Sequence, residues 1–277
     1  VIERANCDGT LELDLYDQGI DHLPSDIGRL TGLIFLSLSD NQLTVLPPEI
    51  WNLTNLTTLW MNNTQLAELP PEIGNLANLG ELDIGHGPFI SRIRDPRTFS
   101  GLETTVVGHG NLTALPPQIG NLTKLKGLFI NGNRLTMVPP EIGNLTKLKM
   151  LQLSHNQVTT VPPEIGNLLG LEFLWLESNQ VTALPPEIGN LKKLRDLAVS
   201  DNQLAELPPE IGDLENLTDL ILKSNRLTSL PPDIGRLNQL KELHLSGNPI
   251  TKLPPEIGDL TNLRKLDLSG AKLTELP

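Results

Sequence analysis

Apolar residues recur along the chain with a period of 23 residues. Each unit reads L-x-x-L-x-L-x-x-N-x-L and closes with L-P-x-x-I-x-x-L. In residues 148–153, Leu151 and Leu153 alternate with residues of the opposite face, which is the pattern of a strand with one buried side. One unit cannot bury its own leucines, so neighbouring units must stack. The pattern therefore predicts a repeat solenoid.

The register of the repeat runs from Thr10 to Leu263 and predicts about twelve units over residues 10–277, with the last unit incomplete. Residues 1–9 are expected to form a short N-terminal cap. Residues 79–101 keep the 23-residue length but lose the proline-rich half, so we interpret them as a degenerate unit and expect the loosest stacking there. The chain stops at Pro277 inside a unit, which suggests a fragment of a longer protein.

The second halves of the units together carry 20 of the 23 prolines. Each second half predicts one short helical or 3-10 turn. Asn156 follows its strand at the bend, where a side-chain amide satisfies backbone groups of adjacent coils. Stacked units therefore predict an asparagine ladder. The ladder should be interrupted at Thr64, Gly87 and Gly110, which stand at the asparagine position.

The L-P-P-E-I-G-N-L string, as at residues 184–191, resembles leucine-rich repeat proteins of the 23-residue class. It is similar to the repeats of bacterial Roco-type GTPases and of Ras-group intracellular leucine-rich repeat proteins. The resemblance implies an α/β solenoid shaped as a horseshoe, with a parallel concave β-sheet and short helical or 3-10 turns on the convex side. It also implies an arm that works beside or against a small GTPase, or beside a GTPase domain of the same chain.

Residues that face outward from the strands should line the concave face and carry the function. Six of the nine aromatic residues, Tyr16 among them, fall at such positions, where we expect them in solvent as anchors for a partner. The alternative is that the rings pack laterally and stiffen the sheet. The candidate partner-binding residues are Phe35, Trp60, His86, Val106, His109, Phe129, Met150, Gln152, His155, Phe173, Trp175 and Ile221.

The formal charge of −12 disfavours a nucleic-acid partner, because cationic side chains supply most of the affinity for phosphates. Acidic residues such as Glu81 and Asp196 lie on both sides of the apolar centre of the concave face. They would steer a partner with basic residues, or they serve solubility alone; the sequence leaves both interpretations open.

Two Gly-His-Gly motifs place His86 and His109 at equivalent positions of consecutive units. We expect polar contacts from them and no metal site, because no acid is in phase with the pair. Arg92, Arg94 and Arg97 form either a contact loop or, as we favour, a solvated and drifted repeat. Cys7 is the single cysteine and is expected to be a packing residue.

No phosphate-binding, nucleophile-elbow, zinc or dithiol motif occurs, so the sequence predicts neither an enzyme nor a cofactor. We expect a non-catalytic module that recognises a protein on its concave face. The alternatives are the regulatory arm of a Roco-type GTPase protein and a secreted bacterial surface or effector protein. No apolar run reaches the length of a membrane span, and a cytoplasmic location is expected unless a leader was removed. The oligomeric state stays open.

Overall fold

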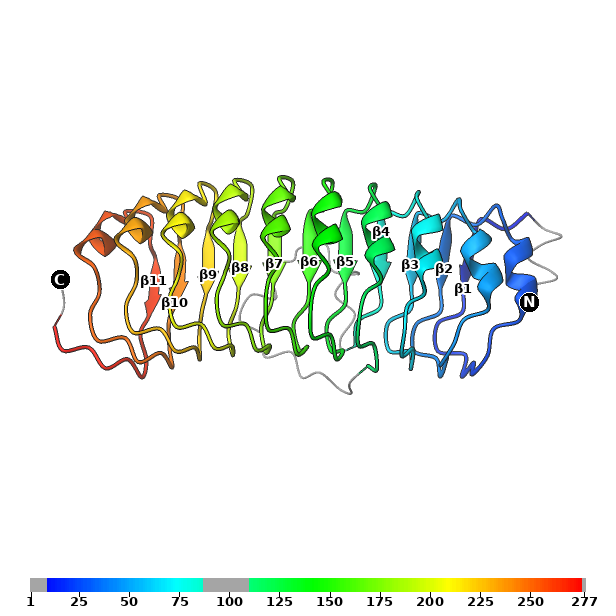
Figure 1. Cartoon of the computed structure of the whole chain (residues 1–277), viewed down its shortest axis with the longest axis horizontal. Coiled ribbons are helices and arrows are strands. Elements are labelled where there is room, and N and C mark those ends of the chain that lie inside the picture. The colour runs from blue at the N-terminus through cyan, green and yellow to red at the C-terminus, as the bar shows by residue number, and fades with distance from the viewer. Residues whose placement is uncertain (1–8, 87–109, 276–277) are drawn as a thin grey trace.

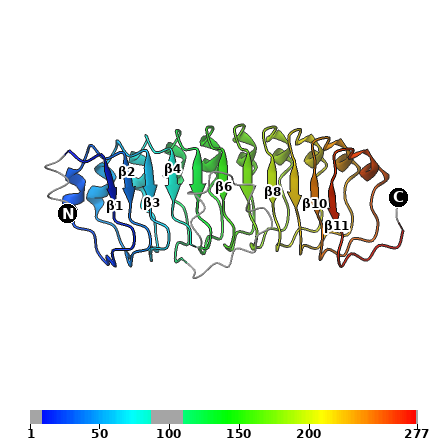
Figure 2. The ribbon, with the colours of Figure 1, turned by 180° about the vertical axis from the view of Figure 1, so that it is seen from behind.

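The structure is a computed structural model, and it describes residues 9–86 and 110–275. Its strands form one parallel sheet in which the order in space is the order in sequence. They lie on one face of an elongated solenoid, and short 3-10 helices lie on the other face (Figures 1 and 2). The described strands are β1 (Glu12–Asp14), β2 (Phe35–Ser37), β3 (Thr58–Trp60), β4 (Glu81–Asp83), β5 (Gly127–Phe129), β6 (Met150–Gln152), β7 (Phe173–Trp175), β8 (Asp196–Ala198), β9 (Asp219–Ile221), β10 (Glu242–His244) and β11 (Lys265–Asp267).

The proline-rich half of each coil forms a 3-10 helix of five residues, as the sequence predicts. In η7, Pro162 is extended and Pro163 opens the helix, while the Leu168 N–H closes it on the Ile165 carbonyl. The described helices are η1 (Ser25–Arg29), η2 (Pro48–Asn52), η3 (Pro71–Asn75), η5 (Pro117–Asn121), η6 (Pro140–Asn144), η7 (Pro163–Asn167), η8 (Pro186–Asn190), η9 (Pro209–Asp213), η10 (Pro232–Arg236) and η11 (Pro255–Asp259).

A glycine inside most of these helices allows neighbouring coils to touch. A β-carbon added to Gly143 would lie 2.7 Å from the carbonyl oxygen of Glu164, in the next coil. The same addition to Gly166 would lie 2.6 Å from the carbonyl oxygen of Glu187. No side chain fits at such distances, so the glycine permits the close spacing of the 3-10 helices.

The asparagine ladder is present. The side-chain amide of Asn156 donates to the carbonyls of Leu153 in its own coil and Ile130 in the preceding coil. Its amide oxygen accepts the N–H of Leu135 at 3.0 Å. These backbone groups are buried and would otherwise lack partners, so each ladder asparagine ties two coils together. At the predicted interruption, Thr64 bonds only to Met61 of its own coil among the described contacts.

One expected strand does not take its place in the sheet. The sequence pattern puts a strand near Thr104 and Val106, between those of residues 81–83 and 127–129. Instead β4 pairs directly with β5, with Glu81 opposite Gly127, so this step in the sheet takes 46 residues and every other step takes 23. Val106, like the rest of residues 87–109, lies outside the described residues. The sheet that the structure describes therefore has eleven strands.

The two ends of this extra segment meet. His86 donates its backbone N–H to the carbonyl of Asn131, and Gly110 donates to the carbonyl of the next residue, Gly132. His86 and Gly110 thus bond to consecutive residues of the following coil. The segment between them is one repeat long, which is why it leaves the sequence register intact.

The sequence of residues 87–109 departs from the repeat at core positions. Arg92 and Pro96 stand where the preceding unit has Leu69 and Ile73, which are both buried in the core. The expectation of loosest stacking at this seam is wrong for the described residues, because β4 and β5 pair over their full length and η3 packs on η5. The predicted N-terminal cap, apart from Gly9, and the ladder position Gly87 lie outside the described residues.

In the part of the chain that the structure describes, no helix has the length and apolar character needed to cross a membrane.

Candidate partner-binding face

Two rows of side chains run across the outward side of the sheet. Each strand contributes its first residue to one row and its third residue to the other, since alternate residues of a strand share a face. We call these the first row and the third row. The first row is Glu12, Phe35, Thr58, Glu81, Gly127, Met150, Phe173, Asp196, Asp219, Glu242 and Lys265, and the third row is Asp14, Ser37, Trp60, Asp83, Phe129, Gln152, Trp175, Ala198, Ile221, His244 and Asp267.

Most of the third row between β5 and β10 is buried, which corrects the expectation that its large residues stand in solvent. Phe129 is 5% exposed and Trp175 is 4% exposed, and Gln152 between them is buried as well. Parallel strands lie about 4.8 Å apart, so side chains at the same register cover one another. The alternative of lateral packing therefore accounts for these rings better than free exposure does.

Small neighbours make room for the large side chains. The ring of Phe129 covers Gly127 of the same strand, and a β-carbon added there would come within 2.9 Å of it. Trp175 packs with Ala198 and Ile221 in a cluster of its own, outside the main leucine core, and Phe173 lies against that cluster. The two aromatic rings of β7 meet edge to face, with their centroids 6.4 Å apart.

Both tryptophans of the third row donate to a carboxylate on the next strand. Trp60 Nε1 lies 2.7 Å from Glu81 Oε1, and Trp175 Nε1 lies 3.1 Å from Asp196 Oδ1. The indole N–H is thereby satisfied while the ring is covered. Because each acid is in the first row, the two rows are joined by the same contact at two places on the sheet.

Apolar residues of the first row remain accessible. Phe35, Met150 and Phe173 are half-buried, and so is Trp60, whose ring meets that of Phe35 edge to face at 4.9 Å. Tyr16, two residues after Asp14 of the third row, is exposed. The accessible apolar surface thus forms two groups, one on β2 and β3 and one on β6 and β7.

Three carboxyl groups on or next to the sheet face have raised pKa values. Burial, together with the charge of Asp219 on the neighbouring strand, raises the pKa of Asp196 to about 7 against the hydrogen bond from Trp175. Burial also raises the pKa of Glu177, which accepts a hydrogen bond from the Ser154 hydroxyl. Burial likewise raises the pKa of Glu81. The face thus holds carboxyl groups whose charge a cationic partner would favour.

The histidines are dispersed. His86 is buried beside the joint with Gly110, His155 is half-buried with φ of 57° at the turn after β6, and His109 lies outside the described residues. His244, which is not among the candidate residues, lies with its Nε2 2.8 Å from Glu242 Oε2. Within residues 9–86 and 110–275 no group of three His, Cys, Asp or Glu side chains could hold a metal ion. Arg92, Arg94 and Arg97 lie outside these ranges.

Family models for leucine-rich repeats match most of the chain. The model described as a leucine-rich repeat region matches residues 12–94 and 162–244. Two further leucine-rich repeat models match residues 100–158 and 123–181, and residues 238–277. No curated protein sequence matches the chain.

Solved structures of the same architecture agree with this assignment. A leucine-rich repeat protein of Leptospira interrogans is 35% identical, with a TM-score of 0.80, over 100% of this chain and 71% of that one. The plant peptide hormone receptor RGFR1, solved in complex with RGF2, is 30% identical with a TM-score of 0.78, over 97% of this chain and 41% of that one. The chain belongs to the leucine-rich repeat family.

Proposed function

We propose that the sheet face binds a protein partner, and that the first row makes the contact. The observation that carries this proposal is the partial exposure of Met150 and Phe173, in the row that also holds Asp219 and Glu242 two and three strands beyond Phe173. Accessible apolar side chains bordered by charge are typical of interaction sites. The partner should therefore present apolar side chains together with lysine or arginine.

The buried residues of the third row support this surface from beneath. Trp175 packs against Phe173, Ile221 extends this packing onto β9, and Phe129 covers Gly127, the register neighbour of Met150. We therefore assign Trp175, Phe129, Gln152 and Ile221 a supporting role. Phe35 and Trp60 offer a second accessible group near the N-terminal end of the sheet.

The family assignment supports binding as the role, because leucine-rich repeat domains are commonly protein-interaction modules. The receptor RGFR1 was solved with a peptide hormone, and this chain is similar to part of that receptor. The proposed activity is recognition and includes no chemical step.

The test compares two pairs of apolar substitutions. Phe173→Ala with Met150→Ala removes the accessible first-row group, while Leu169→Ala with Met137→Ala removes two exposed apolar side chains that lie outside the strands. Each protein would be used to capture partners from lysate of the source organism, with circular dichroism as the check on folding. We expect a captured protein that is retained by the control pair and lost by the first-row pair. Equal capture by both pairs would contradict the proposal.

The identity of the captured protein would separate the finer possibilities. A small GTPase would support the regulatory-arm interpretation that the repeat sequence suggests. Capture of a host protein, in the same experiment repeated with lysate of host cells, would support the secreted-effector interpretation. The placement of the binding surface on the first row is tested by the variants whichever protein is found.

A further inference from the structure

Trp51 occupies a position that is glycine in every other described 3-10 helix. It follows Ile50 in η2, in the turn that reads Pro-Glu-Ile-Trp-Asn, and it is only 3% exposed. The equivalent residues are Gly28, Gly74, Gly120, Gly143, Gly166, Gly189, Gly212, Gly235 and Gly258.

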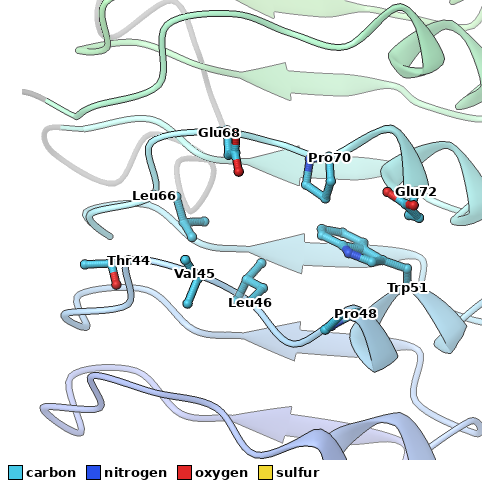
Figure 3. Close-up of a pocket in the computed structure, with 9 residues that line it drawn as sticks. All are labelled: Thr44, Val45, Leu46, Pro48, Trp51, Leu66, Glu68, Pro70 and Glu72. Atoms are coloured by element: carbon cyan, nitrogen blue, oxygen red, sulfur yellow. The ribbon is translucent and has the colours of Figure 1, made fainter.

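The presence of tryptophan instead of glycine at position 51 changes the spacing between the coils that contain η2 and η3. In the preceding coil, a β-carbon added to Gly28 would lie 2.8 Å from the carbonyl oxygen of Glu49, so glycine is needed for close contact there. An indole at the next step cannot occupy that space, and η2 and η3 lie in looser contact than the other neighbouring pairs of described 3-10 helices. The ring of Trp51 points from η2 into the gap (Figure 3).

A pocket opens beside the ring of Trp51, between the coil that contains η2 (coil two) and the coil that contains η3 (coil three). It lies away from the sheet face (Figure 3). Its volume is about 230 Å³. An apolar cavity of roughly 150 Å³ holds benzene, whereas sites for drug-sized ligands are about 300 Å³ or larger. The pocket therefore suits one apolar side chain rather than a cofactor. It is lined by Thr44, Val45, Leu46, Pro48, Trp51, Leu66, Glu68, Pro70 and Glu72.

The polar part of this lining is acidic. Glu68 and Glu72 are exposed, both come from coil three, and no lysine or arginine lines the pocket. Among the described residues, neither glutamate takes part in a salt bridge, although pairs such as Arg236 with Asp213 occur elsewhere on the turn side. Val45 at the opposite wall is 68% exposed, which leaves apolar surface open to a partner.

We propose that this pocket is a second docking site, which receives an aliphatic side chain flanked by arginine or lysine from a segment of a partner protein. The aliphatic group would lie against Trp51, Leu66 and Pro70, and the cations would pair with Glu68 and Glu72. The apolar lining selects the central side chain and the two unpaired carboxylates select its neighbours. The site is separate from the sheet face, so it stands whether or not that face binds a partner.

The indole N–H resonances allow the site to be tested directly, because the chain has three tryptophans. Trp51 lines the pocket, whereas Trp60 and Trp175 are on the sheet face and report on binding there. The probe is the capped tripeptide Arg-Leu-Arg, added to the labelled protein and followed in a proton–nitrogen correlation spectrum. Capped Arg-Ala-Arg and Glu-Leu-Glu are the matched probes for the apolar and the charged component.

We expect Arg-Leu-Arg to shift the Trp51 resonance in a saturable way and to leave the other two indole resonances in place. One buried side chain and two exposed ion pairs correspond to weak binding, with a dissociation constant of about 1 mM or weaker. Glu68→Gln with Glu72→Gln should weaken binding about threefold or more, since each exposed ion pair contributes modestly. The matched probes should both bind more weakly than Arg-Leu-Arg.

Trp51→Gly restores the residue of the other coils and should close the gap between η2 and η3. We expect this variant to fold as before and to lose the binding of Arg-Leu-Arg, detected by calorimetry. If Trp51→Gly unfolds, the glutamine pair still decides the outcome. The proposal would be overturned if Arg-Leu-Arg caused no saturable shift at Trp51, if Arg-Ala-Arg bound equally well, or if binding appeared only after deletion of residues 87–109, which would make the chain itself the occupant.

Discussion

The side-chain amide of Asn133 donates to the carbonyl of Ile84 at 2.9 Å, across 49 residues of chain. The same ladder bond from Asn156 reaches Ile130, 26 residues earlier. Asn133 also accepts the N–H of Leu112, as Asn156 accepts that of Leu135. Asn133 therefore bonds to Ile84 and Leu112 as to a single coil, as if His86 were followed by Gly110.

Deletion of residues 87–109 should leave the solenoid intact, because the backbone bonds of His86 and Gly110 already complete the coil. Shortening the connection also lowers the entropic cost of closing it, by up to about 3 kcal/mol. We expect an unchanged circular dichroism spectrum and a melting temperature equal to or above that of the parent. Loss of the cooperative transition would show that these residues are required for the stacking of β4 on β5.

Replacing a ladder asparagine should destabilise the protein strongly. Asn156→Ala removes the bonds donated to the carbonyls of Ile130, Leu153 and Ser154 and the one accepted from Leu135, and leaves buried backbone groups without these partners. The expected loss is about 3 kcal/mol in the free energy of unfolding. Urea denaturation would measure it, with Asn167→Ala at the exposed end of η7 as the control, for which the loss should stay within about 0.5 kcal/mol. Equal losses would argue against the ladder as the source.

Replacing a glycine of the 3-10 helices should destabilise the protein only where the next coil packs closely against that glycine. Gly143→Ala places a methyl group about 3 Å from backbone and side-chain atoms of the next coil, and should cost about 1–3 kcal/mol through overpacking. Gly258 occupies the same position in η11, where an added β-carbon meets nothing within 4 Å. Gly258→Ala should therefore be near neutral in a thermal melt. A similar cost at both sites would mean that the backbone conformation, rather than the neighbouring coil, requires glycine.

Stability should fall as pH rises from about 4 to about 7 because of Asp196. Its folded pKa is about 7, while the ordinary value is 3.8, so the folded state holds a proton that the unfolded state has lost within this window. Above the window, the buried carboxylate costs at most about 4 kcal/mol.

Asp196→Asn should remove most of this pH dependence of stability. The difference in the free energy of unfolding between about pH 5 and about pH 8 should therefore be smaller in the variant than in the parent. The amide oxygen of the variant keeps an acceptor for Trp175. Urea denaturation of parent and variant at both pH values would measure the difference, and Asp201→Asn, at an exposed position, is the control. Parallel pH curves for the parent and Asp196→Asn would contradict the assignment.

The repeat units were predictable because their physics is local. Leu151 and Leu153 alternate in sequence, Pro162 and Pro163 restrict the backbone, and Asn156 has donors and an acceptor at a fixed place in each coil. The period therefore predicts the parallel sheet, the 3-10 turns and the ladder. The period does not predict that β4 pairs directly with β5. A segment that is one repeat long keeps the spacing of the following leucines, so the period alone does not distinguish it from a regular unit.

The accessibility of the candidate site depended on contacts between coils. Trp175 and Phe129 are outward-facing in the strand pattern, yet they are covered because Ala198 and Gly127 beside them are small. Phe173 and Met150 occupy the other row and remain accessible. The role of Trp51 was missed for the opposite reason, since it lies in the turn half of the unit and not in a strand. A comparison of each turn with its neighbours would have found it, because nine other described turns carry glycine there.

Trp51 of η2, at the gap to η3, also affects the curvature of the solenoid. Backbone hydrogen bonds hold β2 and β3 at the same register as every other pair, so the spacing on the sheet side is fixed. A wider gap on the turn side alone tilts one coil relative to the next. The residue after the isoleucine of each turn therefore sets the local curvature of the molecule, and Trp51→Gly should straighten the arc at a single joint.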